Sequence, residues 1–228
     1  MQTINFDKLK VKSRDLVLDI GCGEGRHSLG LHVDREINAV GMDLSLKDMR
    51  TAKSRIKDFS ISKNNKSSCV FGAGSIHSLP FNDNLFDAVI CSEVLEHLDS
   101  LESAVSEIVR VLKPGGSLIA IETFGHNLLF NCKRKWNVFR GNRTTWAADH
   151  IMKNDEWRKM SAHFETVNIY YFGLTGLILV PLIRFLPHKI KIISTNFFST
   201  IDKQLFKIEM LKPLAFKTVV QLTGLRQS

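Results

Sequence analysis

Short apolar runs alternate with amphipathic stretches along most of the chain. The runs have the length and composition of buried strands, which we expect near residues 16–20, 38–43, 68–72, 86–91, 117–122, 164–172 and 218–224. Apolar residues at helical spacing between them predict helices at 25–33, 45–58, 99–112 and 153–162. Strands that alternate with helices in this way predict an α/β fold built on a mostly parallel sheet.

The first expected strand runs directly into a glycine-rich turn. Its sequence is Val17-Leu18-Asp19-Ile20-Gly21-Cys22-Gly23-Glu24-Gly25, and the next helix follows at once. Glycines let the backbone turn sharply and leave room for a ligand at van der Waals distance, which a Cβ would obstruct. The turn therefore predicts a nucleotide-binding site.

The spacing of the glycines separates two kinds of nucleotide site. A dinucleotide fingerprint requires Gly-x-Gly-x-x-Gly beside a pyrophosphate, but its third position here is Arg26. Asp19 and Glu24 place carboxylates where a pyrophosphate would be repelled. These carboxylates suit the ammonium and sulfonium charges of S-adenosylmethionine (SAM), because opposite charges attract strongly in a partly desolvated cleft. The loop favours SAM.

An acidic residue ends the second expected strand. Asp43 lies about 20 residues beyond the glycine turn, where a carboxylate can accept hydrogen bonds from both ribose hydroxyls. The alternative role for Asp43 is the N-cap of the following helix, which Ser45 can fill better. We therefore expect Asp43 to be a ribose ligand.

Further blocks follow in the order that a nucleotide-binding α/β domain requires. They are Gly74-Ser75-Ile76-His77-Ser78-Leu79-Pro80-Phe81, the strand at 86–91, the turn Glu93-Val94-Leu95-Glu96-His97, and Val111-Leu112-Lys113-Pro114-Gly115-Gly116. With these blocks, residues 14–123 resemble a class I SAM-dependent methyltransferase of the ubiquinone and menaquinone biosynthesis subgroup. The resemblance implies SAM as cofactor and a Rossmann-like seven-stranded, mostly parallel sheet of order 3-2-1-4-5-7-6, sandwiched by helices, with a helical insertion between the sixth and seventh strands.

The resemblance also implies which residues hold SAM. Asp19, Gly21 and Gly23 would contact the methionine end, Asp43 the ribose, Ser75 and Ile76 the adenine, and the Cys91-Ser92 backbone the amino group. Cys22 and Leu44 adjoin these positions and complete the expected set, although the commoner role for Cys22 is that of a compact residue that fills a tight turn. The family usually has Asp where Ser75 stands, so the resemblance implies a modestly weaker affinity for SAM.

The turn after the fourth expected strand supplies the candidate catalytic bases Glu93, Glu96 and His97. Their Glu-x-x-Glu-His pattern is similar to that of coclaurine N-methyltransferases and cyclopropane fatty acid synthases, in which these positions serve the acceptor site. The same residue types also start and pack helices in this superfamily. His150 and His126 are rival bases, and any base is needed only if the acceptor holds its proton at neutral pH.

Charge divides the chain into two unlike halves. Residues 1–123 hold 15 Lys and Arg against 17 Asp and Glu, whereas residues 124–228 hold 16 against 6, so the net charges are −2 and +10. Such an asymmetry points to an anionic partner, which could be a phosphorylated substrate, an acidic membrane surface or nucleic acid. The asymmetry does not choose among them.

We expect a single domain over residues 1–228. Its core would comprise 14–123, 153–172 and 217–226, and acceptor or lid insertions would occupy 124–150 and 173–216. The first insertion carries Lys133-Arg134-Lys135-Trp136, which could bind a phosphate or an anionic headgroup or be a solvated basic loop.

The second insertion is rich in apolar residues. No residue between 167 and 183 is charged, but glycines, Pro181 and Arg184 make this run unlike a spanning helix. Ile201, Leu205, Ile208 and Leu211 define one apolar helical face. This face could be a plain lid over the sheet, or a surface that lies on a bilayer or receives a lipid tail.

Composition adds two expectations about location and metals. Residues 1–15 are polar and charged, so we expect no secretory signal and a cytoplasmic protein, with peripheral membrane association left open. The four cysteines, at 22, 69, 91 and 132, lack metal-ligand spacing, and no metal is expected.

The sequence thus predicts a SAM-dependent methyltransferase that acts at oxygen or carbon of a small-molecule or lipid-like acceptor in a biosynthetic pathway. An RNA methyltransferase is the alternative enzyme, but the chain has no recognisable RNA-binding module, so nucleic acid is disfavoured as a partner. A non-catalytic SAM-fold protein at a membrane would need a ruined glycine loop, and this loop is intact. The acceptor and the oligomeric state stay open.

Overall fold

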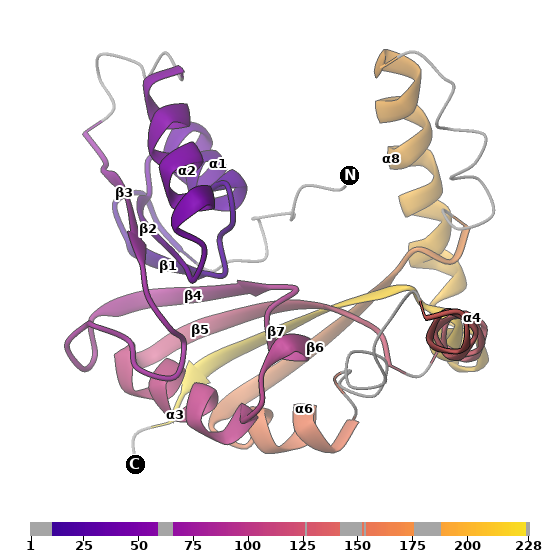
Figure 1. The fold of residues 1–228 in the computed structure, drawn as a ribbon. Helices are drawn as coiled ribbons and strands as arrows, with labels where there is room; N and C mark the ends of the chain where they lie inside the picture. Colours follow the sequence, from indigo (N-terminus) through magenta and orange to yellow (C-terminus); the bar gives the residue numbers. More distant parts are fainter. Residues whose placement is uncertain are drawn as a thin grey trace.

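The computed structural model describes residues 11–58, 66–125, 127–141, 152, 154–175 and 188–226. Strands and helices alternate along most of these residues (Figure 1). In chain order they are β1 (Leu16–Ile20), α1 (Arg26–Arg35), β2 (Asn38–Asp43), α2 (Leu46–Asp58), β3 (Cys69–Ala73), β4 (Phe86–Ser92), the 3-10 turn η2 (Leu95–His97), α3 (Leu101–Val111), β5 (Leu112–Thr123), α4 (Leu128–Phe139), α6 (Asn154–Ser161), β6 (Phe164–Phe172), α8 (His188–Leu205), the 3-10 turn η3 (Glu209–Leu214) and β7 (Lys217–Leu225).

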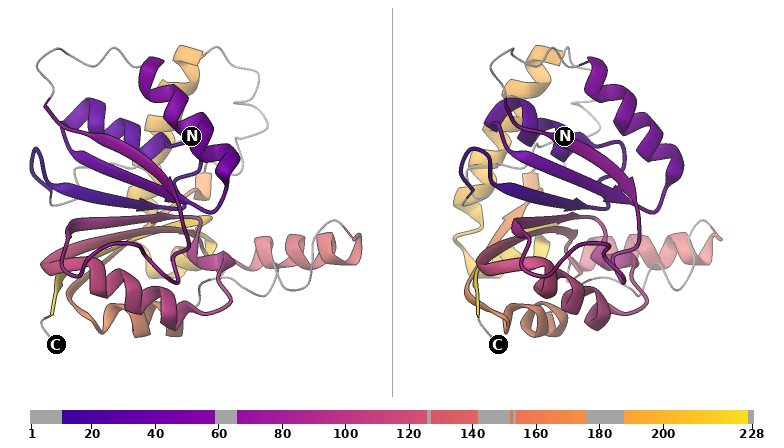
Figure 2. Two further views of the ribbon diagram at one scale, coloured as in Figure 1. Left: turned by 60° about the vertical axis from the view of Figure 1, so that its left-hand side comes forward. Right: turned by 90° about the vertical axis from the view of Figure 1, so that its left-hand side faces the viewer.

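The seven strands form one sheet in the order β3-β2-β1-β4-β5-β7-β6. Neighbours from β3 to β5 are parallel, whereas β7 runs antiparallel to both β5 and β6. The expected fold class and strand order are therefore confirmed. Helices α1 and α2 cover one face of the sheet, and α3 and α6 cover the other (Figures 1 and 2).

The core lies on both faces of the central strands. Val89 of β4, Ile108 of α3 and Met160 of α6 pack on one face, where each is almost completely buried. Ile90 of β4 and Leu31 of α1 pack on the other. Successive side chains of a strand point to opposite faces, so a strand covered on both sides must be apolar at every position. This explains the unbroken apolar runs in the sequence.

The strand that contains Pro114-Gly115-Gly116 begins earlier than expected. Helix α3 ends at Val111, and β5 continues directly from Leu112, which pairs with Phe86. The register shifts before Ser117 pairs with Ala88. A strand-end irregularity therefore absorbs the proline and glycines that lie between the expected helix at 99–112 and the expected strand at 117–122.

A helical insertion between β6 and β7 is confirmed, but its apolar stripe does not form a single helical face. Helix α8 ends at Leu205, and Ile208 precedes the separate turn η3 and is exposed. Phe206, at the break, packs instead with Phe124 and Ala215. The expectation of one continuous helical face from Ile201 to Leu211 was wrong, because burial of Phe206 fixes a turn there.

Two other points concern the insertions. The first insertion contains α4, a helix that the sequence analysis did not expect. The uncharged run at 167–183 begins within β6, and its part from 176 onward lies outside the described residues. Within the described residues, no helix has the length and apolar character to cross a membrane.

Candidate functional site

The carboxyl ends of β1, β2 and β4 meet at one edge of the sheet, where the glycine turn lies. Gly21 and Cys22 donate their backbone N–H groups to the carbonyl of Met42, at 2.7 and 3.1 Å. Glu93 donates its N–H to the carbonyl of Ile121 at 2.8 Å. Ligands of open parallel sheets bind at such an edge, and the backbone ladder fixes its loops there.

The three glycines of the turn have different structural roles, although all have positive φ (66°, 50° and 77°). A Cβ on Gly21 would clash with a Val94 methyl carbon, and one on Gly25 would lie 2.5 Å from the Phe71 ring. A Cβ on Gly23 would meet no atom of the described residues within 4 Å. Gly21 and Gly25 therefore permit close packing, and Gly23 faces open space where a ligand can approach the backbone.

Asp43 ties the second strand to this turn. Its Oδ2 accepts a hydrogen bond from the Gly23 N–H at 2.9 Å, and its Oδ1 accepts one from the Ser45 N–H at 2.9 Å. Ser45 caps α2, since its Oγ accepts from the Asp48 N–H at 3.2 Å. Leu44 beside it is 76% exposed. The carboxylate thus lies at the ligand side of Gly23, and the helix-capping role belongs to Ser45.

Asp19 is a completely buried carboxyl beneath the turn. Its Oδ2 accepts from the backbone N–H and hydroxyl of Ser28, at 3.0 and 2.6 Å, which anchors the start of α1. Its Oδ1 has no hydrogen-bond partner among the described residues. Burial raises the pKa of Asp19 to about 7, and the charge of Asp43 also raises it. A cation or an amino group near the loop would stabilise the ionised form.

The expected adenine residues follow β3. Ser75 accepts a hydrogen bond from the His77 N–H at 3.2 Å. The Ile76 side chain is buried in the core beside Leu79, so a ligand at this edge would meet its backbone rather than its side chain.

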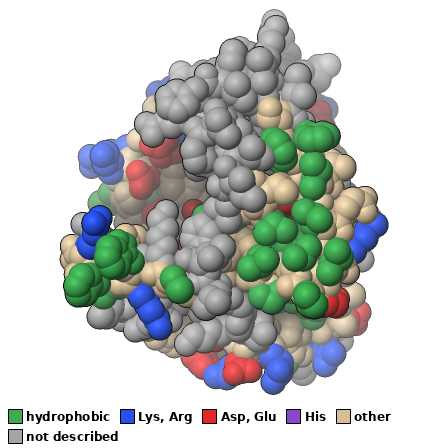
Figure 3. Space-filling model, turned by 90° about the vertical axis from the view of Figure 1, so that its right-hand side faces the viewer, with side chains coloured by type: hydrophobic (Ala, Val, Ile, Leu, Met, Phe, Trp, Pro, Cys, Tyr) green, Lys and Arg blue, Asp and Glu red, His purple; other side chains and the backbone are tan. Residues whose placement is uncertain are grey.

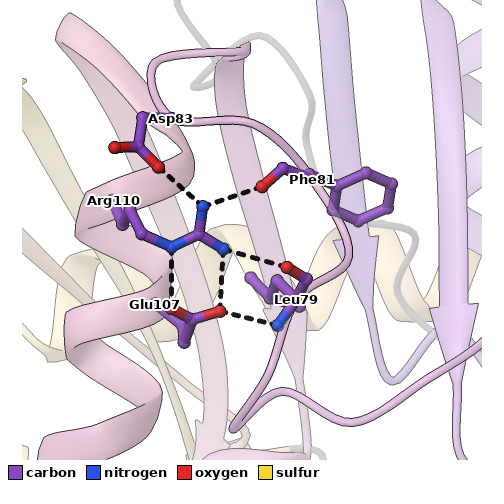
Figure 4. Close-up of polar contacts among 5 residues, drawn as sticks. All are labelled: Leu79, Phe81, Asp83, Glu107 and Arg110. Atoms are coloured by element: carbon purple, nitrogen blue, oxygen red, sulfur yellow. Dashed lines mark hydrogen bonds and ion pairs between the residues drawn. The ribbon is translucent and has the colours of Figure 1, made fainter.

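A polar network anchors the chain just beyond Ser75 and Ile76 (Figure 4). The Arg110 guanidinium donates to the carbonyls of Leu79 and Phe81, at 2.9 and 2.7 Å, and to the Asp83 carboxylate at 2.7 Å. It also forms a bidentate pair with Glu107, at 2.7 and 2.8 Å. Glu107 in turn accepts from the Leu79 N–H at 2.6 Å. Helix α3 thereby holds the β3–β4 connection in one conformation.

The expected cysteines lie inside the protein. Cys22 and Cys91 are buried, and burial raises the pKa of each thiol well above its usual range. Cys22 packs with Phe71 and Met49, which agrees with a compact residue filling the turn. Ser92 ends β4 and is only partly buried, so the backbone at Cys91-Ser92 reaches the ligand edge.

Three candidate bases follow β4 on one short turn. Glu93 adopts a positive φ of 57° and forms an ion pair with Lys217 at the start of β7. Glu96 is largely buried, and its Oε2 has no hydrogen-bond partner among the described residues. The His97 Nε2 lies 3.8 Å from Glu96 Oε1 and is mostly exposed. His126 and His150 lie outside the described residues.

Glu122 is a buried carboxyl that the sequence analysis did not single out. It lies near the end of β5, and its Oε1 accepts from the N–H groups of Val94 and Leu95, at 3.1 and 2.9 Å. Burial raises the pKa of Glu122 to about 8, and the charge of Glu96 adds to this. Through these two hydrogen bonds, Glu122 fixes the backbone of the turn that carries Glu93, Glu96 and His97. The sequence signal was a carboxylate at the end of an otherwise apolar strand.

Comparison with known proteins shows which family this arrangement resembles. Residues 18–120, which include the glycine turn, Asp43 and the η2 turn, match the family model described as a methyltransferase domain. Over these residues the chain is similar to the methyltransferase domains of that family.

Curated relatives of this segment include enzymes named for different acceptors. An uncharacterised methyltransferase of Schizosaccharomyces pombe is 32% identical over 158 residues, which cover 61% of this chain and 57% of the relative. A sterol 24-C-methyltransferase of the same organism is 37% identical, over 48% of this chain and 28% of the relative. A demethylmenaquinone methyltransferase of Renibacterium salmoninarum is 36% identical, over 48% and 41%. The chain thus covers about half or less of the length of these relatives.

Solved structures share the fold of this protein over nearly the whole chain. A SAM-dependent methyltransferase of Methanosarcina mazei has a TM-score of 0.66 at 18% identity, and the match covers 100% of this chain and 99% of the other. Phosphoethanolamine N-methyltransferase 2 of Haemonchus contortus, solved in complex with SAM, has a TM-score of 0.69 at 16% identity, over 98% and 51%. The sheet beyond residue 120 therefore belongs to the same fold.

Proposed function

We propose that this chain binds SAM at the edge formed by β1, β2 and β4 and transfers its methyl group to a small-molecule acceptor. The observation that carries the proposal is the open space beside Gly23, bordered by the Asp43 carboxylate. A backbone without a Cβ, next to a carboxylate at the carboxyl end of a parallel strand, suits the sugar and amino acid ends of an adenosyl amino acid.

The residues of this edge fit SAM in their chemistry. We assign the turn backbone at Gly21, Cys22 and Gly23, with Asp19 beneath it, to the methionine end, and Asp43 to the ribose. Exposed Leu44 would cover an apolar face of the nucleoside, Ser75 and the Ile76 backbone would meet the adenine, and the Cys91-Ser92 backbone the amino group. When bound, SAM supplies a methyl carbon already activated by a positive sulfur.

The work left to the protein is alignment and exclusion of water. Holding an acceptor at near-attack distance from the reactive carbon can lower the barrier by several kcal/mol. The η2 turn borders the same edge, and Glu122 fixes its backbone. A fixed turn would keep any side chain it presents to the acceptor in one position.

Among the candidate bases we favour Glu96. Glu93 is already held in an ion pair with Lys217, whereas Glu96 keeps a buried oxygen without a hydrogen-bond partner among the described residues. Such an oxygen can accept a hydrogen bond from a polar group of the acceptor. The exposed His97 ring lies beside Glu96 and is the second candidate, and His150 is a rival proposal.

We infer a small and apolar acceptor, of the quinone or sterol type, methylated at oxygen or carbon. The support is that relatives at 36–37% identity are named for demethylmenaquinone and sterol substrates. A phosphate on the acceptor would suit the basic second half of the chain, whose net charge is +10.

The cofactor proposal is tested by titrating the protein with SAM in a calorimeter. Replacing Gly23 with Val would fill the open space beside the turn, so we expect binding to weaken at least about a hundredfold, which is about 2.7 kcal/mol. Gly115 provides a matched control, because it also has positive φ (77°) and open space around its Cβ position among the described residues. It lies at the start of β5, at the opposite edge of the sheet.

Gly115→Val carries the same kind of backbone strain and should keep the wild-type affinity for SAM. Equal losses of affinity in the two variants would mean that strain, not the ligand space, decides binding. Absence of SAM binding by the folded wild-type protein would overturn the proposal.

A further inference from the structure

Helix α4 projects from the body of the molecule (Figure 2). Its base is fixed, because the Asn127 side-chain amide donates to the carbonyls of Leu214 and Ala215, at 2.7 and 3.0 Å. Asn131 adds a hydrogen bond from its amide to the Gly125 carbonyl at 2.9 Å. The helix therefore presents its far end at a defined place outside the core.

Exposed aromatic side chains gather at the far end of α4. Trp136 is 55% exposed and Phe139 is 82% exposed, and their ring centroids lie 5.8 Å apart. The Arg140 guanidinium lies over the Trp136 ring, 5.2 Å from its centroid. Figure 3, which faces the side of α4 and α8, shows hydrophobic side chains beside basic ones on a projection of the surface. We call Lys135, Trp136, Phe139 and Arg140 the α4 tip.

The charged residues of α4 and its tip are all basic. From residue 127 to residue 141 the sequence has four basic residues and no Asp or Glu. Lys135 and Arg140 flank the two exposed rings, so the apolar surface is bordered by cations. An apolar patch bordered by basic side chains is complementary to a surface that is anionic outside and hydrocarbon inside.

We propose that the α4 tip docks on the anionic surface of a lipid bilayer. Tryptophan favours the boundary between headgroups and acyl chains, where its ring is apolar and its N–H reaches polar groups. Phe139 enters the acyl boundary, and Lys135 and Arg140 bind anionic headgroups. This inference goes beyond the proposed methyl transfer and does not rest on it.

A bilayer fits the α4 tip better than nucleic acid does. The exposed rings sit at the end of a projecting helix, which can reach a flat surface while the rest of the protein stays clear of it. Nucleic acid bound without sequence preference lies along a basic groove in which bases stack on successive aromatic rings. The α4 tip is a convex end, and its two rings already contact each other.

Sedimentation with vesicles tests the proposal on the full chain. We expect the protein to pellet with vesicles of phosphatidylcholine mixed with an equal amount of phosphatidylglycerol. We expect little binding to phosphatidylcholine alone, and weaker binding in high salt, because salt screens the headgroup charge. Trp136→Ser with Phe139→Ser, or Lys135→Glu with Arg140→Glu, should each lower the partition coefficient about tenfold or more.

Matched controls change equally exposed side chains elsewhere. Met210→Ser removes an apolar side chain that is 85% exposed, and Arg158→Glu reverses a charge whose side chain is 81% exposed. Both controls should bind the mixed vesicles as the wild type does. The α4 tip variants should keep the wild-type circular dichroism and SAM titration, which separates loss of docking from loss of folding or of the cofactor site.

Three outcomes would overturn the docking proposal. The wild-type protein could fail to pellet with the mixed vesicles, the α4 tip variants could bind them as well as the controls do, or a single-stranded RNA could displace the protein from vesicles at equimolar phosphate. None of these results bears on SAM binding at Gly23.

Discussion

Glu122 shows how one buried carboxyl organises the edge of the sheet. It accepts hydrogen bonds from Val94 and Leu95 and lies close enough to Glu96 for the two charges to interact. Among the described residues, no cationic side chain forms an ion pair with Glu122. A buried carboxyl in this setting favours its neutral form, since ionisation in a low-dielectric environment is costly.

Replacing Glu122 with Gln should change how stability depends on pH. Burial raises the pKa of Glu122 in the folded protein from its usual value of 4.5 to about 8. The folded state therefore binds more protons than the unfolded state between these values, so wild-type stability falls as pH rises through this window. Gln cannot ionise and still accepts the two backbone hydrogen bonds, so the variant should gain stability relative to wild type by up to about 1.4 kcal/mol per pH unit.

Urea unfolding followed at several pH values between 5 and 8.5 checks this prediction. Asp19, whose pKa is also raised, is present in both proteins, so its contribution cancels in the difference. Glu165→Gln alters an exposed carboxylate on β6 and serves as the control. A difference between wild type and Glu122→Gln that stayed constant with pH would contradict the assignment.

At the scale of the elements, Arg110 couples α3 to the connection between β3 and β4. Its guanidinium makes five hydrogen bonds, which only a planar fork can make at once (Figure 4). Arg110→Lys keeps the charge but leaves several acceptors without a donor, so we expect a loss of about 1–3 kcal/mol of stability.

The same variant should weaken SAM binding several-fold, because the loosened connection carries Ser75 and Ile76. In the wild-type protein the Leu79 N–H donates a hydrogen bond to Glu107. Hydrogen exchange of this N–H should be faster in the variant. Arg158→Lys, on the exposed surface of α6, should change neither property. Unaltered exchange at Leu79 together with weaker SAM binding would refute the prediction that Arg110 supports SAM binding through the β3–β4 connection.

The elements that the sequence predicted well are those whose signals are local. The strands up to β4 and the glycine turn follow from apolar runs and from glycines within a few residues. The break after Leu205 does not, because it depends on burial of Phe206 against Phe124, which lies far away in the sequence. The bond from Leu95 to Glu122 and that from Thr175 to Asp202 each join residues 27 positions apart. Periodicity carries no information on such pairs.

At the scale of the whole molecule, the residues that match the family model are fewer than the residues that form the sheet. The match covers residues 18–120 and ends inside β5. On its other side, β5 pairs with β7 from Ser117↔Thr223 to Thr123↔Lys217. The place of β7 between β5 and β6 came from family resemblance, because no local pattern specifies which strands become neighbours. The sheet is thus completed by residues from the far end of the chain.

A chain that ends at residue 125 should therefore fail to fold as a monomer. Without β7, the ladder groups of β5 and the side chains of Leu118, Ile119 and Ala120, all fully buried in the whole protein, would lie at an open edge. An exposed apolar edge strand pairs with other chains, so we expect aggregates in gel filtration and no cooperative thermal transition. Co-expression with residues 126–228 should restore a one-to-one complex that unfolds in a single transition, because β7 can pair with β5 from a separate chain. A monomeric fragment of residues 1–125 with a cooperative transition would instead show that the parallel half of the sheet is stable without the antiparallel strands.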